Sequence, residues 1–448
     1  MHPDDTIVAI STPPGRGGIG VVRLSGPEAR SIASPLLRLK HDLEPNRAIF
    51  GELIEPSTAE RIDEVVVTFF EKPHSYTTDD VLEISAHGSP VVLRHIIELC
   101  LARGARLAEP GEFTLRAFLN ARLDLTQAEA VRDLIESQTL YQAKVAAQQL
   151  EGALSRRLQP LKQELINLIA VMEAGIDFAE DDVAVLPWDD ISRRIAALRV
   201  PLEKLAGSFA YGKVVHEGLT LAIVGRPNVG KSSLFNRLVE RERAIVTATP
   251  GTTRDLVSET VSLGGIPVRL VDTAGLRAAH DEVESIGIQK TYEAAADADL
   301  ILVVLDVSQH TSDDDALIAR FQDRRAIVVE NKCDLLSTEY RVLSTENVRT
   351  SAISGEGIDL LREEILKRVG SDGAARESGF LTSVRHQQLV RDSISALDAA
   401  AQSTANRVPH EMILLDLYNA LRALDTITGQ TTADDILNLI FSSFCIGK

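Results

Sequence analysis

Cysteine is scarce in this 448-residue sequence, and the three that occur, Cys100, Cys333 and Cys445, are widely separated. An odd number of scattered cysteines fits neither a disulfide framework nor the spacing of a metal site, and it suits a reducing compartment. No apolar run approaches the length of a membrane span, and the stretch MHPDDTIVAI is acidic where a signal peptide would be basic. We therefore expect a cytoplasmic protein that makes no membrane contact.

Positive charge is also scarce, with 47 Lys and Arg against 65 Asp and Glu, and the formal net charge is −18. Non-specific affinity for nucleic acids comes from Lys and Arg that neutralise phosphates. The balance excludes a general nucleic-acid coat, but not an RNA held by a local patch or presented by a basic partner. The 44% of hydrophobic residues predicts real cores, and the length allows about two to four domains.

Residues 1–118 mix strand patterns with helices. The turn-rich stretch TPPGRGG at 12–18 leads into the strand pattern IGVVRLSG, and 63–70 and 80–85 are further strand patterns. We expect an α+β N-terminal domain over these residues.

From residue 119 the sequence becomes helical. Thr126 and Glu129 have the spacing of a capping box, and a long helical pattern runs from there towards DFAEDD. A second helical stretch follows Pro187. Because helical patterns return near the C-terminus, residues 119–216 and 377–448 are predicted to be the two halves of one all-α domain.

Between these halves, residues 217–376 alternate strand and helix. The apolar runs LTLAIV, VRLVDT, DLILVVLD and RAIVVENK have the length of strands, and helical segments and turns separate them. This order predicts a mostly parallel sheet with helices on both faces. The stretch GSDGAARESG at 370–379 is typical of a linker. The predicted fold is therefore multidomain, with an α/β domain inserted into the all-α domain.

The stretch GRPNVGKS at 225–232 fits the phosphate-binding pattern G-x-x-x-x-G-K-[ST], with a strand pattern before it and a helix pattern after it. Glycines let backbone N–H groups surround phosphates, and the helix N-terminus adds its dipole. Lys231 would reach the β- and γ-phosphates, and the Ser232 hydroxyl would ligate Mg²⁺.

Two further stretches suit the magnesium and the γ-phosphate. In DTAG, at 272–275, Asp272 would hold the magnesium through water and the Gly275 N–H would meet the γ-phosphate. The stretch TPGTTRD, at 249–255, lies between this motif and the P-loop, and its Thr253 would supply a second hydroxyl to Mg²⁺.

NKCD, at 331–334, indicates the base. Guanine presents two donors on one edge, and a single carboxylate, that of Asp334, accepts both. Adenine offers no such pair, and sites built on such hydrogen bonds discriminate by roughly 10⁴ or more. The rest of the pocket would come from Asn331 and Lys332, which brace the loop and cover the base, and from the backbone N–H groups of Ser351 and Ala352. The order of the motifs therefore predicts GTP.

The sequence lacks a residue that Ras-like switches use for hydrolysis, a glutamine directly after the DxxG glycine. Leu276 stands there and cannot orient water. One alternative is a monovalent cation bound by the amide oxygen of Asn228 and by carbonyls of residues 247–252. The other is an acidic residue in HDEVESIG, at 280–287, although such carboxylates also commonly solvate a helix start.

Several motifs together resemble the MnmE (also TrmE) family of tRNA modification GTPases: GRPNVGKSSLFN, TATPGTTRD, DTAGLR followed by DEVESIG, NKCD, SAISGEGI and FSSFCIGK. The resemblance covers essentially the whole chain. It implies a folate-binding N-terminal domain that mediates homodimerisation, and an inserted G domain that dimerises with GTP and K⁺. Members of the family form a heterotetramer with the flavoprotein MnmG. They add an aminomethyl or carboxymethylaminomethyl group to C5 of the wobble uridine (U34) of certain tRNAs, with 5,10-methylene- or 5-formyl-tetrahydrofolate as cofactor.

The resemblance also implies roles for individual residues. The GTP-binding set is Asn228, Val229, Gly230, Lys231, Ser232, Ser233, Thr247, Ala248, Thr249, Pro250, Gly251, Thr252, Thr253, Asp272, Thr273, Ala274, Gly275, Asn331, Lys332, Asp334, Ser351 and Ala352. The K⁺ ligands are Asn228, Thr247, Thr249 and Thr252, and the Mg²⁺ ligands are Ser232 and Thr253. Glu284 matches the catalytic glutamate, which orients the attacking water through a second water. The folate contacts are Arg23, Glu83, Arg122 and Lys448, with Arg122 standing where some relatives have lysine.

Cys445 lies four places from the end of the sequence, where a prenylation box would have its cysteine. Gly447 is not aliphatic and Lys448 is a poor final residue for such a box, so lipidation is disfavoured. The preceding ILNLIFSSF predicts a helix that would direct the tail towards the folate site between domains. The family resemblance makes Cys445 a functional residue, whereas Cys100 and Cys333 are expected to be structural.

Two other kinds of GTPase compete with this interpretation. GRGG at 15–18 has the spacing of a KH-type GxxG loop, which would suit an RNA-binding GTPase of ribosome assembly. That loop should join two helices, however, and here prolines precede it and a strand pattern follows. A membrane-remodelling GTPase is disfavoured because no membrane segment or lipid-binding patch is evident.

Overall fold

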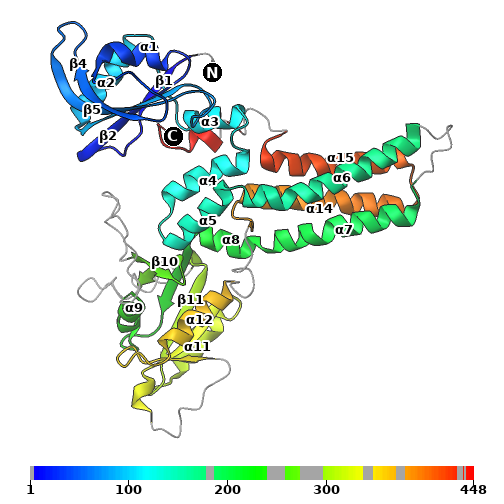
Figure 1. The fold of residues 1–448 in the computed structure, drawn as a ribbon. Helices are drawn as coiled ribbons and strands as arrows, with labels where there is room; N and C mark the ends of the chain where they lie inside the picture. The colour runs from blue at the N-terminus through cyan, green and yellow to red at the C-terminus, as the bar shows by residue number, and fades with distance from the viewer. Residues whose placement is uncertain are drawn as a thin grey trace. The chain divides into compact units, whose positions relative to one another are not determined.

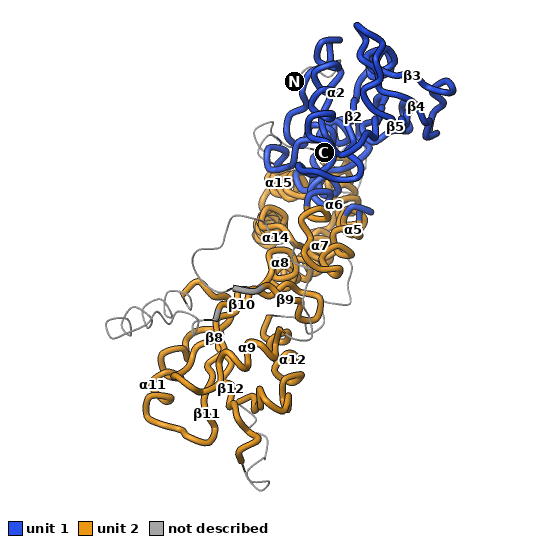
Figure 2. The backbone as a smooth tube through the Cα atoms, turned by 90° about the vertical axis from the view of Figure 1, so that its left-hand side faces the viewer, with its two compact units in different colours: residues 1–132, 150–152, 425–448 blue, residues 133–149, 153–424 orange. Residues whose placement is uncertain are grey.

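The computed structural model describes residues 5–177, 186–239, 258–272, 296–336, 347–369, 379–430, 437 and 440–447. The chain divides into two compact units (Figure 2), one made of residues 1–132, 150–152 and 425–448 and the other of residues 133–149 and 153–424. None of the helices in the described ranges combines the length and the apolar character that crossing a bilayer requires.

The first unit contains a seven-stranded sheet in the order β3-β4-β5-β6-β2-β1-β7. Its strands are β1 (Ile7–Ile10), β2 (Gly17–Ser25), β3 (Leu37–Leu39), β4 (Ala48–Ile54), β5 (Arg61–Phe70), β6 (Val81–Gly88) and β7 (Arg106–Leu107). Neighbouring strands are antiparallel except for β1 and β7. On β5, Val65, Val67 and Phe69 are buried, so alternate side chains face the core.

The helices of this unit pack against the sheet or lead away from it. They are α1 (Ala29–Ala33), the short 3₁₀ turn η1 (Ser34–Leu36), α2 (Pro90–Leu101), α3 (Glu112–Leu119) and α4, which starts here (Leu125–Glu136). Helices α1 and α2 contact the sheet, and their apolar side chains complete its core. The α+β prediction for this part of the chain is therefore confirmed.

The GRGG sequence at 15–18 leads into β2, whose first residue is Gly17. It does not join two helices, so the KH-type interpretation of this stretch is wrong.

The start of α4 differs from the prediction. The capping box is formed by Asp124 and Gln127, not by Thr126 and Glu129. Asp124 Oδ1 accepts from the Gln127 N–H at 2.9 Å, and Gln127 Oε1 accepts from the Asp124 N–H at 3.0 Å. Aspartate is a strong N-cap residue, and the helix begins directly after it at Leu125.

The second unit contains the long helices and a second sheet. Its helices outside the sheet are α5 (Leu140–Leu150), α6 (Ala153–Asp177), α7 (Trp188–Gly207), α8 (Phe209–Glu217), α14 (Val384–Ala405) and α15 (His410–Thr428). Helices α6, α7, α14 and α15 run side by side (Figure 1). The single long helical pattern predicted after residue 126 is thus three helices, because Thr139 starts a new one and Gly152 has a positive φ of 83°.

The second sheet has six strands in the order β13-β12-β11-β8-β10-β9. They are β8 (Leu219–Val224), β9 (Ser258–Leu263), β10 (Ile266–Asp272), β11 (Leu300–Asp306), β12 (Ala326–Asn331) and β13 (Val348–Arg349), and among these only β9 pairs antiparallel. The elements around them are α9 (Lys231–Val239), α11 (Ser312–Phe321), the 3₁₀ turn η3 (Cys333–Leu335) and α12 (Ile358–Arg368).

Both faces of this sheet are covered. Residues of α9 and α12 join one core and Phe321 of α11 joins the other, which explains why all seven residues of β11 are buried. The predicted mostly parallel α/β fold is confirmed. In such sheets, loops after the carboxyl ends of the strands form the binding site.

Candidate functional site

The P-loop connects the end of β8 to the start of α9. Its two glycines have no room for a side chain. A Cβ on Gly225 would lie 2.3 Å from the Val304 carbonyl oxygen, and one on Gly230 would lie 2.3 Å from Asn331 Nδ2. The loop therefore packs tightly against the neighbouring strands and leads into the N-terminus of α9, a position where anions bind.

Lys231 is held by the loop it belongs to. Its Nζ donates to the carbonyl oxygens of Gly225 and Arg226 at 2.8 Å each. The cation is thus kept within the turn of the loop, where it would meet phosphate oxygens.

Arg226 anchors the loop from outside. Its guanidinium forms two 2.7 Å hydrogen bonds to the carboxylate of Asp314 in α11 and one of 2.8 Å to the Gln309 carbonyl. Burial alone would raise the pKa of Asp314, but the hydrogen bonds from Arg226 and from the Thr311 N–H hold it below the ordinary value. The carboxylate is therefore ionised and the bidentate pair is charge-assisted.

Asn228 has a left-handed backbone with φ of 66°, a conformation that asparagine adopts more readily than most residues. It is exposed, as are Ser232 and Ser233, whereas Val229 is buried. The side chains predicted to bind cations are therefore on the accessible side of the loop.

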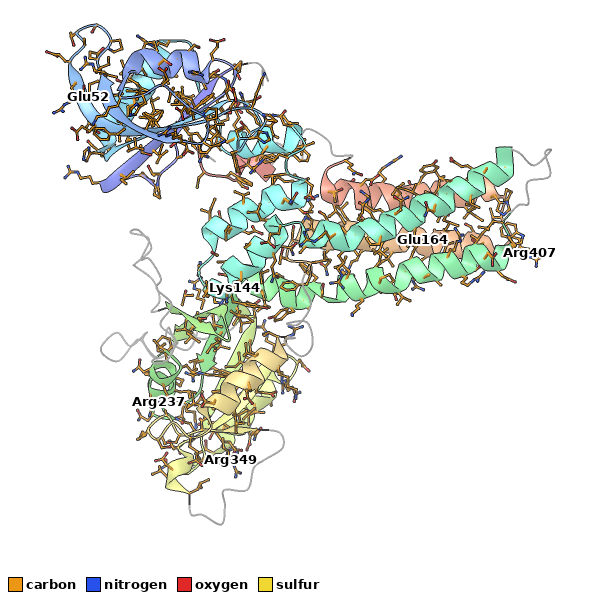
Figure 3. The ribbon with its side chains drawn as sticks, in the orientation of Figure 1. Glu52, Lys144, Glu164, Arg237, Arg349 and Arg407 are labelled. Atoms are coloured by element: carbon orange, nitrogen blue, oxygen red, sulfur yellow. The ribbon has the colours of Figure 1, made fainter. Side chains whose placement is uncertain are left out.

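Asn331, the last residue of β12, ties the P-loop to the base-recognition loops. Its Nδ2 donates to the Val229 carbonyl at 2.9 Å, and its Oδ1 accepts from the Ala352 N–H at 3.1 Å. The side chain is buried. Arg237 of α9 (labelled in Figure 3) adds a second link by donating to the Ala352 carbonyl at 3.1 Å.

Lys332 also has a left-handed backbone, with φ of 65°, and its Nζ lies 2.6 Å from Asp306 Oδ2. Burial would raise the pKa of Asp306, but hydrogen bonds from Lys332 and Ser308 outweigh it and lower that pKa. The ammonium group that the sequence suggested would cover the base is therefore engaged by a carboxylate at the end of β11.

Asp334 lies in η3, and its Oδ1 is buried without a hydrogen-bond partner in the described part of the chain. A buried acceptor that lacks a partner costs free energy, so such an atom points to a donor from outside. The paired N–H donors of guanine fit this requirement. The N–H groups of Ser351 and Ala352, predicted to close the pocket, donate to Glu356 and Asn331 instead.

Many of the predicted site residues lie outside the described residues. They are Thr247, Ala248, Thr249, Pro250, Gly251, Thr252, Thr253, Thr273, Ala274, Gly275, Glu284 and Lys448. Asp272 ends β10, and only its backbone is described. The roles of these residues in binding Mg²⁺ and K⁺, in hydrolysis and in binding folate remain predictions.

The first unit has a pocket of about 740 Å³ whose lining includes Arg23, Glu83 and Arg122. Arg23 on β2 and Glu83 on β6 face each other in register and form an ion pair of 2.7 Å. Arg122 comes from the turn after α3 and lies over the Tyr76 ring, 5.0 Å from its centroid. Three side chains that are far apart in the sequence thus line one polar cavity.

Residues 440–447 pack within the same unit. Ile446 forms an isolated antiparallel bridge with Pro110, and the Ser11 hydroxyl donates to the Gly447 carbonyl at 3.1 Å. Cys445 is exposed and is not among the described residues that line the pocket. Cys100 and Cys333 are buried, as expected for structural residues, and burial raises the pKa of the Cys100 thiol to about 12.

Sequence reasoning missed three residues that shape these sites: Asp306, Asp314 and Tyr76. Asp306 follows six apolar residues in β11. A buried carboxylate at that position requires a cationic partner, and Lys332 was a candidate for it. Asp314 is the third residue of a helix that starts at a capping box, but nothing in the sequence indicated its contact with Arg226. Tyr76 gave no signal of its own.

Two domain profiles match the chain. That of the MnmE helical domain matches residues 125–445, and that of the GTP-binding protein TrmE N-terminus matches residues 6–122. The tRNA modification GTPase MnmE of Koribacter versatilis is 68% identical over 456 residues, which cover 100% of each chain. The protein of the same name from Aquifex aeolicus is 43% identical and covers 99% of this chain and 100% of its own. Among solved structures, the G domain of the T. maritima FeoB iron transporter shares 25% identity, covering 34% of this chain and 98% of its own, with a TM-score of 0.25, too low to support a conclusion.

Proposed function

This chain belongs to the MnmE family of tRNA modification GTPases, and from that premise we propose how its two sites serve the reaction. It is an enzyme that hydrolyses GTP in the course of tRNA modification. The G domain binds the nucleotide, with Lys231 on the phosphates and Asp334 on the guanine edge. The observation that carries the base assignment is the buried Oδ1 of Asp334, which has no hydrogen-bond partner among the described residues.

Hydrolysis in this proposal depends on Mg²⁺ and K⁺. Ser232 and Thr253 hold Mg²⁺, and Asn228 holds K⁺ together with Thr247, Thr249 and Thr252. The supporting observation is that Asn228 is exposed on the P-loop in a left-handed conformation. Because Leu276 cannot orient water, Glu284 takes that role.

The pocket of the first unit is proposed to bind 5,10-methylene- or 5-formyl-tetrahydrofolate, which supplies the one-carbon unit. Glu83 would accept hydrogen bonds from the guanine-like edge of the pterin, as carboxylates do in charge-assisted pairs. Arg23, Arg122 and Lys448 suit the carboxylates of the ligand. The supporting observation is the convergence of Arg23, Glu83 and Arg122 on one cavity of about 740 Å³.

The complete reaction is proposed to need a partner. In a homodimer joined through residues 1–118, and in a heterotetramer with the flavoprotein MnmG, the chain adds an aminomethyl or carboxymethylaminomethyl group to C5 of U34 in certain tRNAs. Cys445 acts in that reaction.

The proposed domain assignment is completed by two helical halves, 119–216 and 377–448, and by the G domain, 217–376. Cys100, Cys333 and Cys445 form no disulfide in the described part of the chain, which suits the cytoplasmic location that belongs to this proposal.

Mass spectrometry of tRNA nucleosides tests this function. A strain without the gene should lack the C5-modified wobble uridines, and the wild-type gene should restore them while the Asp334→Ala variant should not. Unchanged wobble uridines in the deletion strain would refute the tRNA assignment. Calorimetric titration of the purified chain with 5-formyl-tetrahydrofolate tests the folate site separately.

A further inference from the structure

The hairpin of β9 and β10 contacts helix α5 at its turn. Both turn residues, Gly264 and Gly265, have positive φ angles, of 57° and 86°. A Cβ on Gly265 would lie 2.6 Å from the Cβ of Tyr141 in α5. The turn is therefore pressed directly against this helix, on which Lys144 is labelled in Figure 3.

Thr139 joins the hairpin turn to the start of α5. Its Oγ1 accepts from the Gln142 N–H at 3.1 Å, and Gln142 Oε1 accepts from the Thr139 N–H at 3.2 Å, so the two residues form a capping box. The Thr139 hydroxyl also donates a hydrogen bond of 2.5 Å to the Gly265 carbonyl. One side chain thus starts α5 and holds the turn.

Apolar contacts surround this hydrogen bond. Ile266, the first residue of β10, is buried in a cluster with Val145, Tyr211, Val215 and Phe380. The hydroxyl groups of Tyr141 and Tyr211 are 2.9 Å apart. We call Thr139, Tyr141, Val145, Tyr211, Val215 and Phe380 the hairpin socket. It belongs to the helical region and encloses the beginning of a strand of the G domain.

The other end of β10 reaches the nucleotide motifs. The strand ends at Asp272, the first residue of DTAG, and pairs in parallel with β8, which leads into the P-loop. Six residue steps separate Ile266 from Asp272, which is about 20 Å of extended chain. A paired strand is a stiff element, so a displacement at Asp272 reaches the socket.

The socket has room for such a displacement. A cavity of about 170 Å³ lies beside it, lined among others by Gln149, Val215 and Pro267. Gln149 Oε1 is buried there without a hydrogen-bond partner in the described part of the chain. Close-packed cores resist continuous deformation and shift between discrete arrangements. A cavity next to the contact provides the space for a second arrangement.

We propose that the β9–β10 hairpin couples the nucleotide state of the G domain to the helical region, with Thr139 and Tyr141 as positioning residues. The proposal rests on the family's role as a GTPase in tRNA modification. Such coupling is reciprocal, so the socket also biases the site at Asp272. Removing the contact between Thr139 and the hairpin should impair tRNA modification while GTP hydrolysis stays nearly unchanged.

Two substitutions at Thr139 separate helix capping from the hairpin contact. Thr139→Ser keeps both the capping oxygen and the donor. Thr139→Asp keeps a good capping oxygen but cannot donate to the Gly265 carbonyl and places a charge beside it. The readouts are GTP turnover of the purified chain and, in cells, the tRNA nucleoside that disappears when the gene is deleted.

Thr139→Ser should behave as wild type. Thr139→Asp should hydrolyse GTP within about twofold of the wild-type rate, whereas modification should fall at least about fivefold, the lower end of usual coupling effects. Normal modification in Thr139→Asp would overturn the proposal. A parallel loss of hydrolysis and modification would also overturn it, because the hairpin would then merely support the nucleotide site.

Hydrogen exchange of the wild-type chain gives a second test that needs no variant. Replacing GDP by a non-hydrolysable GTP analogue should change the exchange rates of the first amides of α5, and identical rates would overturn the coupling. This measurement uses no tRNA, so it remains decisive even if the proposed tRNA chemistry fails.

Discussion

The side-chain amide of Asn331 donates a hydrogen bond of 2.9 Å to the carbonyl of Val229, so the end of β12 holds the middle of the P-loop. We predict that Asn331→Ala weakens GTP binding by about 10- to 100-fold, since it removes hydrogen bonds worth about 1 kcal/mol each from a buried position. Fluorescence titration with a labelled nucleotide measures the affinity. Asn347→Ala, which removes a bond to Glu330 in the same sheet, is the control. Equal affinities in the two variants would contradict the prediction.

Replacing Asp334 with asparagine should change base specificity. The new amide keeps one acceptor and gains a donor, which suits xanthine, whose carbonyl stands where guanine has its amino group. Affinity for GTP should fall by about 10² or more, and affinity for xanthosine triphosphate should rise. Competition of each triphosphate against labelled GDP measures both values. A variant that still prefers GTP would show that Asp334 does not contact the base.

GTP turnover should be much faster in K⁺ than in Na⁺ at equal ionic strength. A cation that replaces an arginine finger would raise the hydrolysis rate by about 10³- to 10⁵-fold. Asn228→Ala should remove the difference between the salts. Glu284→Ala should abolish hydrolysis and leave GTP binding intact, whereas the neighbouring Glu282→Ala should leave both hydrolysis and GTP binding intact. Equal rates of the wild-type chain in both salts would remove the role of the cation.

Glu83→Gln should weaken binding of 5-formyl-tetrahydrofolate by about 10- to 100-fold, because hydrogen bonds to a charged group contribute about 1.5–3 kcal/mol. Calorimetric titration measures the affinity. Glu44→Gln, which alters an exposed ion pair with Arg47, is the matched control. If both variants bind the ligand equally well, the pocket around Arg23 and Glu83 has another function.

Acid should destabilise the chain partly through Glu112, which is fully buried. Burial alone would raise its pKa, but hydrogen bonds from Arg106 and the Glu109 N–H, with Arg116 nearby, lower it. The unfolded state therefore takes up the proton first. The stabilisation is complete above about pH 4.3, the ordinary value, and is lost as the pH falls through the lowered pKa of the folded state.

Urea unfolding at a series of pH values tests this titration. Glu112→Gln should be less stable at neutral pH by about 3 kcal/mol, because its partner Arg116 stays buried. Its stability should also fall less steeply in acid than that of the wild type. A variant with the same slope as the wild type would show that Glu112 does not contribute to the acid transition.

Hydrophobic pattern and motif order were enough to predict the fold class. The runs of β8, β11 and β12 are mostly apolar because helices cover both faces of their sheet, and this pattern is visible in the sequence. The breaks between α4, α5 and α6 were not predicted, since they depend on a capping choice at Thr139 and a positive φ at Gly152. Such local choices barely change the helical periodicity.

The sites were predictable to different degrees. The P-loop lies between a strand and a helix as expected, because its glycines and its lysine are fixed by phosphate chemistry. Asp306 and Asp314 were not expected as partners of Lys332 and Arg226, since those pairs join distant segments and charged residues have many possible partners. From the sequence alone, Arg23, Glu83 and Arg122 could not be distinguished from ordinary charged residues of the surface. Only the family resemblance indicated them.

Residues 425–447 share a unit with residues 5–132, and Phe441 and Phe444 pack with Leu115 and Leu125 in one core. Nearly three hundred residues separate the two segments along the chain. At about 5–20 residues per second, a ribosome needs roughly 15 to 60 seconds to make the intervening part. During that time the apolar side chains of α3 and α4 that contact these phenylalanines stay uncovered. Chaperones thus have a defined interval in which to guard them, and this unit matures after the G domain has emerged.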